Sequence, residues 1–173
     1  MSRTRLVTPD DAPALARLVG ENRQFFRPFE PTRPDRYFTE DGQRQVISRA
    51  LEEHAAGRTH PRVILDDGRL VGRITLSGIE RGPFQNCRLG YLVGEDSNGR
   101  GLATSAVRDM VEIAFTELRL HRVEAGTLTD NVRSQRVLQR NGFVRFGLAP
   151  AYLNIAGEWR DHVMYQKVRA ETG

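Results

Sequence analysis

Residues 87–115, CRLGYLVGEDSNGRGLATSAVRDMVEIAF, constrain the fold more than any other part of the sequence. The first seven of these residues are mostly apolar and predict a strand. Three glycines, Gly94, Gly99 and Gly101, then fall within eight residues. Apolar side chains recur with helical spacing over residues 102–115, the clearest helix pattern in the chain. A glycine cluster between a strand and a helix is typical of a loop that holds phosphate groups.

A loop for nucleoside triphosphates does not fit this stretch. Gly94 and Gly99 have the required spacing, but Arg100 and Gly101 stand where the lysine and the magnesium-binding hydroxyl should be. The sequence also shows no spacing of ligands typical of a structural zinc site, because Cys87 is the only cysteine and the four histidines are scattered. We therefore expect neither a triphosphate loop nor a metal site.

A dinucleotide loop fits only weakly. Gly99 and Gly101 match its first two glycines, but Thr104 replaces the third and His121 stands where an acidic ribose partner is needed. The remaining interpretation is an anion cradle over residues 98–103, in which successive backbone N–H groups and the start of a helix face one concavity. Such a cradle would bind pyrophosphate without lysine or metal, although a plain strand-to-helix turn is the alternative.

The other elements predict a mixed sheet flanked by helices. Strands are expected at residues 5–8, 62–65, 70–76, 87–93, 122–128, 143–146, 151–155 and 162–168. Helices are expected at residues 12–21, 41–56, 102–115 and 133–140. Between the first two helices, FFRPFEPTRP (residues 25–34) alternates phenylalanine with proline and predicts an ordered loop or lid. With 173 residues and no linker or repeat, a single domain over residues 1–173 is expected.

Composition and charge indicate a globular protein rather than a disordered one. The net charge is +4, and Lys167 is the only lysine, so nearly all basic residues are arginines. Arginine suits anionic ligands or a nucleic-acid-rich partner, but we favour an ordinary solvated surface for most of them. No secretory signal and no run of about 18 apolar residues is present. A cytoplasmic location without a membrane partner is the expectation.

Five segments carry a resemblance to a known family. The strand LGYLV, the glycine loop and NVRSQRVLQRNGF together resemble the GNAT superfamily of acetyl-CoA-dependent N-acetyltransferases. A closer similarity is to ribosomal-protein alanine N-acetyltransferases of the RimJ and RimL type. It rests on ENRQFFRPFEPTRP (21–34), ERGPFQNCRLGYLVG (80–94), NVRS (131–134), RNGF (140–143) and YLNIAGEWRDHVMY (152–165). The resemblance implies a single-domain α/β fold, a mostly antiparallel sheet of about seven strands with about four helices.

The resemblance also implies an acetyl-CoA site. Its expected residues are Leu92, Val93, Asn98, Gly99, Arg100, Gly101, Leu102, Ala103, Thr104, Asn131, Ser134 and Arg136. Asn98 departs from the Gln or Arg that usually opens the loop motif, which matters little if the backbone binds the pyrophosphate. Arg133, Arg136 and Arg140 share a helix face and would meet the 3′-phosphate or an acidic partner, with a solvated face as the alternative.

Candidate catalytic residues follow from the reaction, which needs a neutral amine, a polarised carbonyl and a protonated leaving sulfur. Backbone N–H groups near Val93 and Gly94 would polarise the carbonyl. The tyrosine that many GNAT enzymes use as acid is Leu138 here, so Ser134 is the expected acid, with helix capping as the alternative. Glu124 is the nearest acidic candidate for the base, and a salt-bridged strand residue is the competing interpretation.

The substrate side is expected at aromatic residues. Phe26, Phe29, Tyr152 and Trp159 are candidates for an acceptor cleft beneath the lid, although core packing would explain each of them singly. Cys87 lies inside a strand, so we expect a buried thiol rather than an acyl-enzyme nucleophile.

Three functions remain open at this point. The resemblance implies acetylation of the N-terminal alanine of a ribosomal protein, in a ternary complex and without sequence-specific contacts to nucleic acid. The alternatives are acetylation of a small amine, such as an antibiotic or polyamine, and a non-catalytic acyl-CoA sensor. No heptad or apolar strip indicates an oligomer, so monomer and homodimer both stay open.

Overall fold

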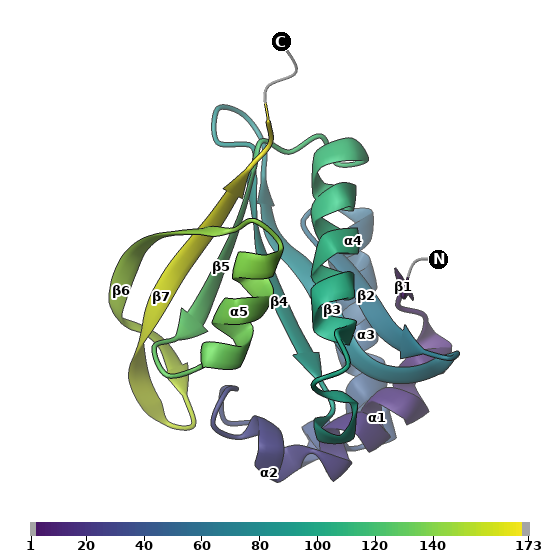
Figure 1. The fold of residues 1–173 in the computed structure, drawn as a ribbon. Helices are drawn as coiled ribbons and strands as arrows, with labels where there is room; N and C mark the ends of the chain where they lie inside the picture. The colour runs from purple at the N-terminus through teal and green to yellow at the C-terminus, as the bar shows by residue number, and fades with distance from the viewer. Residues whose placement is uncertain (1–2, 171–173) are drawn as a thin grey trace.

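One seven-stranded sheet forms the centre of the computed structural model, which describes residues 3–170 (Figure 1). The strands are β1 (Thr4–Leu6), β2 (His60–Asp66), β3 (Arg69–Glu80), β4 (Asn86–Val93), β5 (Arg122–Leu128), β6 (Val144–Ile155) and β7 (Glu158–Val168). Their order is β1-β2-β3-β4-β5-β7-β6, and among the described residues only β4 and β5 pair in parallel. The predicted mixed, mostly antiparallel sheet is confirmed.

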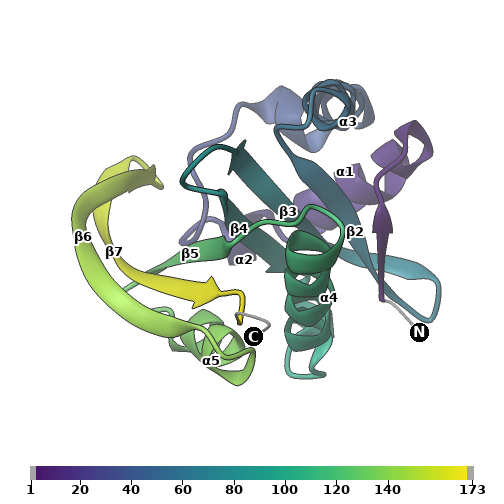
Figure 2. The ribbon, with the colours of Figure 1, turned by 90° about the horizontal axis from the view of Figure 1, so that it is seen from above.

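Helices cover both faces of this sheet (Figure 2). They are α1 (Ala12–Glu21), α2 (Arg23–Phe26), α3 (Glu40–Ala55), α4 (Leu102–Thr116) and α5 (Val132–Arg140), with 3-10 turns at Pro9–Asp11, Asp35–Phe38 and Glu95–Ser97. On one face α4 packs through Ala106, Val107 and Met110 on the central strands. On the other, α1 and α3 bury Leu15 and Ile47 against β2. In residues 3–170 no helix has the length and apolar character needed to cross a bilayer.

Several expectations about element boundaries were wrong, among them the strand expected at 70–76, which continues to Glu80. The strands predicted at 143–146 and 151–155 are one strand, β6, which continues through Pro150 by a register shift and a left-handed Ala151. β7 begins at Glu158, earlier than expected, because it pairs with the end of β6. The predicted lid, residues 25–34, is not irregular throughout. Its first two residues belong to the helix α2, which ends at Phe26, two residues before the first proline, Pro28. Proline blocks a helix only near its own position.

The two helices nearest the glycine loop begin with different caps. Gly101 precedes α4 in the left-handed conformation, with φ of 77°, and offers no side-chain cap. The first N–H groups of α4 therefore remain available. Asn131 precedes α5, and its Oδ1 accepts a hydrogen bond from the Ser134 N–H at 3.2 Å. This cap fixes the position of Ser134 at the start of α5.

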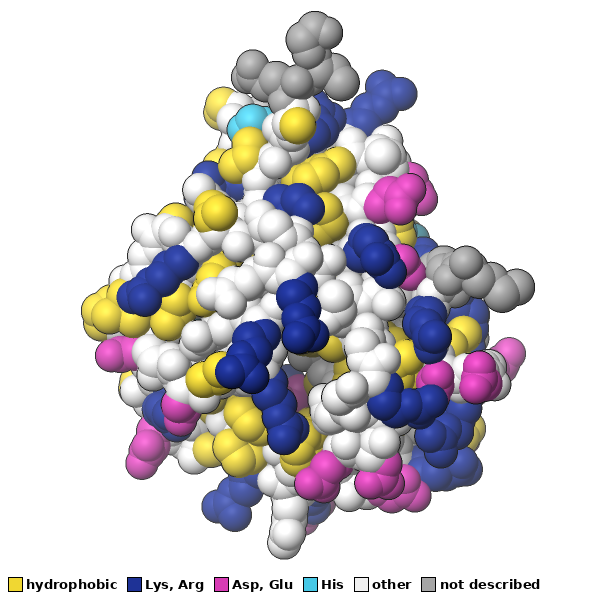
Figure 3. Space-filling model, in the orientation of Figure 1, with side chains coloured by type: hydrophobic (Ala, Val, Ile, Leu, Met, Phe, Trp, Pro, Cys, Tyr) yellow, Lys and Arg dark blue, Asp and Glu magenta, His cyan; other side chains and the backbone are white. Residues whose placement is uncertain are grey.

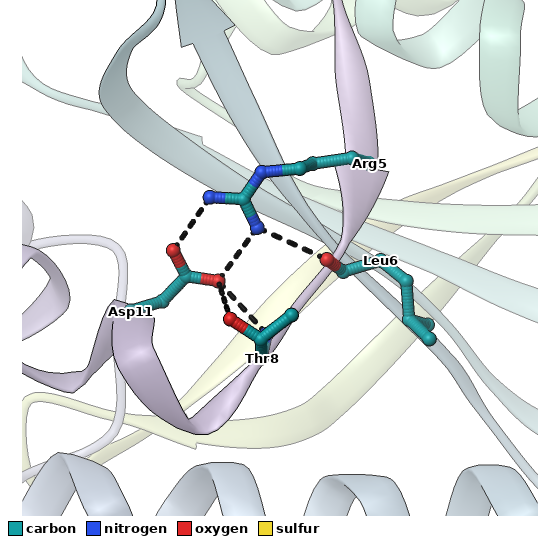
Figure 4. A network of polar contacts seen from close by, with 4 residues as sticks. All are labelled: Arg5, Leu6, Thr8 and Asp11. Atoms are coloured by element: carbon teal, nitrogen blue, oxygen red, sulfur yellow. Dashed lines mark hydrogen bonds and ion pairs between the residues drawn. The ribbon is translucent and has the colours of Figure 1, made fainter.

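A polar network fastens the N-terminal strand to the first helix (Figure 4). Both guanidinium ends of Arg5 donate to the Asp11 carboxylate, at 2.7 and 2.8 Å, and the Thr8 N–H donates to the same carboxylate at 2.8 Å. Burial alone would raise the pKa of Asp11, but these hydrogen bonds outweigh it and the pKa is lowered. The network holds β1 at the outer edge of the sheet.

Candidate active site

Strands β4 and β5 separate at the centre of the sheet. They pair only at Asn86–Arg122, Cys87–Val123 and Arg88–Glu124, and then diverge (Figure 1). On its other edge β4 stays paired with β3, and the Gly94 N–H donates to Val71 O at 2.9 Å. Because antiparallel pairing alternates, the N–H and C=O groups of Tyr91 and Val93 point away from β3, into the gap. Polar backbone is thus presented in the middle of the sheet.

The gap opens into a cavity of about 530 Å³. Its walls are α2 with the following loop, the ends of β4 and β5, the start of α5, and the β6–β7 hairpin. Of the residues predicted for a site, it is lined by Phe26, Phe29, Leu92, Val93, Asn98, Ala103, Asn131 and Ser134. A hollow with Lys and Arg side chains on its rim is visible between α5 and the loop before α4 (Figure 3).

The loop before α4 has the conformation that an anion cradle needs. Gly99 and Gly101 both have positive φ, 76° and 77°, which favours glycine at each position. The Asn98 Nδ2 donates to Val93 O at 3.2 Å and to Gly94 O at 3.0 Å. Asn98 therefore braces the loop from within, which explains how this residue can replace the usual Gln or Arg. The expectation that Gly94 N–H polarises a carbonyl was wrong, since this group is used by β3.

Other residues of the predicted acetyl-CoA set do not line the cavity with their side chains. The Arg100 guanidinium turns away to pair with Asp66 at 2.5 Å. Leu102 is a buried core residue at the start of α4, and Thr104 does not line the cavity. Arg136 and Arg140 are exposed on α5, whereas Arg133 of the same helix lines the cavity. From Gly99 to Thr104, the backbone is what remains for binding.

A pair of hydroxyl groups closes one side of the cavity. The Tyr91 hydroxyl lies 2.7 Å from Ser134 Oγ and 3.3 Å from Ser134 O. Burial raises the pKa of Tyr91 to about 12, with a smaller opposing contribution from the Ser134 hydrogen bond. Tyr91 thus remains a proton donor at neutral pH. Sequence reasoning missed it, although the alternation of Leu89, Tyr91 and Val93 already placed a hydroxyl on an apolar strand face.

Glu124 is not brought to the cavity. Its Oε1 accepts from Arg122 Nε at 2.8 Å, and it sits where β4 and β5 are still paired. This geometry fits the competing interpretation, a salt-bridged strand residue, and does not place Glu124 where a base would act. Cys87 is fully buried, and burial together with nearby Glu124 raises its pKa to about 12. Such a thiol is a poor nucleophile, as expected.

The acceptor side is roofed by the segment after α2. Phe26 is buried, Phe29 is exposed, and both line the cavity. The Ala156 N–H in the β6–β7 turn donates to Glu30 O at 3.1 Å, so this roof is tied to the hairpin. Of the two hairpin aromatics predicted there, Tyr152 packs on His162 with ring centroids 5.5 Å apart, and Trp159 points to solvent with 67% exposure. Neither of these two aromatic residues lines the cavity itself.

Two further polar residues line the cavity and were not singled out from the sequence, Glu30 and His162. Glu30 Oε1 accepts from Arg73 Nη2 at 2.8 Å, and both side chains are largely buried. Glu30 lies inside the lid motif FFRPFEPTRP, where a single acidic residue among aromatic residues and prolines gives no local signal of a site. His162 was the first residue of a predicted strand, and a lone strand histidine carries no site signal.

The comparisons with known proteins agree with this geometry. A family model described as an acetyltransferase (GNAT) domain matches residues 3–144. The chain belongs to the GNAT acetyltransferase family. Among its relatives is the probable N-acetyltransferase YjcK of Bacillus subtilis, 40% identical over 154 residues, 88% of this chain and 85% of that protein. The [ribosomal protein uS5]-alanine N-acetyltransferase of Escherichia coli is 34% identical over 162 residues, 92% and 84% of the two chains.

Solved GNAT structures superpose on almost the whole chain. Mycobacterium smegmatis RimJ in complex with CoA-disulfide has a TM-score of 0.92 and 31% identity, with 95% of this chain and 80% of that chain covered. The predicted family, its RimJ/RimL-type branch and the predicted enzyme class, an N-acetyltransferase, are therefore confirmed.

Proposed function

We propose that this GNAT enzyme transfers the acetyl group of acetyl-CoA to the N-terminal α-amine of alanine in a ribosomal protein, working as one domain over residues 1–173. The observation that carries the proposal is the cavity through the splayed strands, with hydroxyls on one wall and an aromatic roof on another. The alanine N-acetyltransferase activity by which the Escherichia coli relative is named and the CoA complex of Mycobacterium smegmatis RimJ support it. A ribosomal substrate would place the activity in the cytoplasm.

The residues of the donor side fit a coenzyme A thioester. The N–H groups at the start of α4 and the two left-handed glycines form a concavity for pyrophosphate without a cation. The N–H and C=O groups of Tyr91 and the N–H group of Val93 face the gap and can pair with the amide-containing arm, whereas Val93 O already accepts from Asn98. Exposed Arg133, Arg136 and Arg140 on α5 supply positive charge for the 3′-phosphate. When bound, acetyl-CoA would supply an activated acetyl thioester.

Side-chain direction separates a donor side from an acceptor side. Tyr91 and Ser134 meet on the face of the sheet that carries α4 and α5. Gly90 and Leu92 alternate with Tyr91, so they face the opposite side, where Leu92 packs with the α1–α3 cluster. The roof segment with Phe26 and Phe29 lies on this second side. An amine entering under the roof would reach the gap from the side opposite the sulfur.

The chemistry required of the chain is modest for an α-amine. An α-amino group has a pKa of about 7.7–8.0, whereas a lysine lies near about 10.4, so a useful fraction of the α-amine is neutral at pH 7. The Val93 N–H faces the gap and is oriented to polarise a carbonyl there. The Tyr91–Ser134 hydroxyl pair can deliver a proton to the departing sulfur.

The acceptor is tested with a matched set of amines. The protein is mixed with acetyl-CoA and one of four acceptors, and release of free thiol is followed with mass spectrometry of the product. The acceptors are a peptide beginning with Ala, the same peptide with a blocked N-terminus and an internal lysine, spermidine, and an aminoglycoside. Thiol release only with the free Ala peptide is expected. Release only with spermidine or the aminoglycoside would overturn the peptide assignment, and binding of acetyl-CoA without any transfer would favour a sensor.

A further inference from the structure

His162 occupies the acceptor side of the gap. It lies on β7 opposite Leu128, near the end of β5 where the strand has left β4. Val123 and Ala125 face the α4 core, so alternation turns Gly126 to the other face. A Cβ atom on Gly126 would lie 3.6 Å from His162 Cδ2. The imidazole therefore lies beside a strand position with no side chain, on the face away from Tyr91 and Ser134.

The hydrogen bond of the ring fixes its tautomer. His162 Nδ1 lies 3.0 Å from Arg160 O, and a carbonyl oxygen can only accept, so Nδ1 carries the hydrogen. In the neutral ring, Nε2 is then left with a free lone pair. The residue is 4% exposed and lines the cavity, and the Tyr152 ring packs against it. The ring is therefore held in one tautomer, with the Nε2 lone pair left as a hydrogen-bond acceptor.

The acidic groups around His162 are already engaged. Glu30 of the roof pairs with Arg73, and Asp130 at the end of β5 pairs with Arg160. Asp161, next in the chain, accepts the Ala151 N–H at 2.8 Å. The remaining charged or titratable groups that line the cavity or neighbour the ring are Tyr91, Arg133 and Tyr152. Of these groups, Tyr91 is on the opposite face.

We propose that Nε2 of His162 is the base that receives the proton of the acceptor amine. The inference rests on the proposed function only in that some amine is acetylated. The amine nitrogen bonds to the acetyl carbon as the carbon–sulfur bond breaks, and one amine proton passes to Nε2. The Tyr91–Ser134 pair gives a proton to the sulfur. The imidazolium then releases its proton to solvent, and the hydroxyl pair regains one, so the net products are an amide and a free thiol.

The test compares His162→Asn and His162→Ala with His121→Asn, a change at an exposed histidine just before β5. The assay uses the best amine that the wild-type enzyme accepts, whichever class it proves to be. We expect kcat to fall by about 10²-fold in both His162 variants, as is usual for loss of a positioned base. Binding of acetyl-CoA should change less than threefold, and His121→Asn should match the wild type.

Two readouts separate a base from a merely structural residue. The rate of the His162 variants should keep rising with pH as the amine itself loses its proton, and added imidazole should restore turnover of His162→Ala in proportion to its neutral form. Unchanged kcat in His162→Asn, or no rescue by imidazole in a folded His162→Ala, would overturn the proposal. Independently of activity, ¹⁵N NMR of the wild-type ring should show the Nδ1–H tautomer, and an Nε2–H tautomer would contradict it. Failure of the peptide assay alone would leave these readouts intact.

Discussion

The Tyr91 hydroxyl lies 2.7 Å from Ser134 Oγ and joins β4 to α5 on the donor side of the cavity. The same phenol is 3.3 Å from Ser134 O, so it can donate to this carbonyl while it accepts from the Ser134 hydroxyl. When the phenol instead donates to Ser134 Oγ, a proton given up by Ser134 can be replaced from Tyr91. The leucine at the usual tyrosine position, Leu138, is fully buried on α5. The tyrosine hydroxyl that lies beside Ser134 in this chain comes from a different element, β4.

We expect Ser134→Ala and Tyr91→Phe each to lower kcat by about 10²-fold while acetyl-CoA binding stays within a few fold, because each removes one hydroxyl of a proton-donating pair. The double variant should be little worse than either single variant, since the two act as a unit. Single-turnover kinetics with calorimetric binding checks this, and Ser48→Ala on α3 is the control. Fully additive losses would show that the two hydroxyls act separately.

A prediction for the cradle concerns its two left-handed glycines. Gly99→Ala and Gly101→Ala should each cost about 1 kcal/mol of unfolding free energy, because a side chain disfavours positive φ. Each should also weaken acetyl-CoA binding by distorting the N–H array. Gly20→Ala is the matched control, since Gly20 lies in α1 with no atom within 4 Å of the added Cβ. Gly20→Ala should instead raise the unfolding free energy, because alanine favours a helix more than glycine does. Urea denaturation and calorimetry measure both effects, and unchanged binding would exclude the cradle.

The sequence was most informative where local pattern and function coincide. The periodic apolar residues of 102–115 predicted α4 within one residue of its observed end, Thr116. Gly99 and Gly101 similarly identified the loop, because positive φ restricts the residue type. The anion cradle and the family resemblance both depended on this segment. Such features lie close together in the chain and need no knowledge of long-range packing.

The acceptor side was predicted poorly because it is assembled from distant segments. Glu30 meets Arg73 across 43 positions, and the roof is tied to the hairpin at Ala156. Tyr152 and Trp159 were predicted to line the acceptor cleft because they are aromatic. In the β6–β7 hairpin neither side chain lines the cavity. The prediction of Glu124 as the base has a related difficulty. Its ion pair with Arg122 lies where β4 and β5 are still paired, and the point at which the two strands separate cannot be read from local sequence. Strand register decides these positions, and local sequence pattern does not fix it.

Breaking the Glu30–Arg73 pair should destabilise the roof. Glu30→Gln is expected to cost about 1–2 kcal/mol, because it leaves a largely buried guanidinium without its counter-charge. The double change Glu30→Gln with Arg73→Met should cost less than the sum of the singles. Glu40→Gln, which breaks the exposed Glu40–Arg44 pair, is the control and should change stability by less than about 0.5 kcal/mol. Equal effects of the two Glu changes would contradict this difference in burial.

The Asp11 network predicts a loss of stability in acid (Figure 4). The pKa of Asp11 is lowered in the folded protein, since the hydrogen bonds from Arg5 and Thr8 outweigh burial. The stabilisation is therefore present above the unfolded pKa and is lost as pH falls through the lower folded pKa. Asp11→Asn should cost about 1 kcal/mol at pH 7 and progressively less at a pH well below the ordinary value of 3.8. Denaturation of the exposed Asp10→Asn variant provides the comparison, and an equal loss at both pH values would contradict the linkage.

His60 should make stability depend on pH in a different range. Burial, with smaller contributions from neighbouring His54 and Arg62, lowers its pKa from 6.5 to about 4. The unfolded chain therefore binds a proton between these values that the folded protein does not, so the unfolding free energy decreases as pH falls from 6.5 toward 4. The window lies above the one expected for Asp11, whose carboxyl titrates below its ordinary value of 3.8.

His60→Gln removes this titration, and its unfolding free energy should vary less between pH 7.5 and pH 4.5 than that of the wild type. Urea denaturation at several pH values measures the slope. His121→Gln, on an exposed histidine, should keep the wild-type slope. His54→Gln should make the slope shallower but not remove it, because the His54 ring, 5.0 Å from His60, contributes less to the lowered pKa than burial does. A His60→Gln slope equal to that of the wild type would show that other groups govern this range.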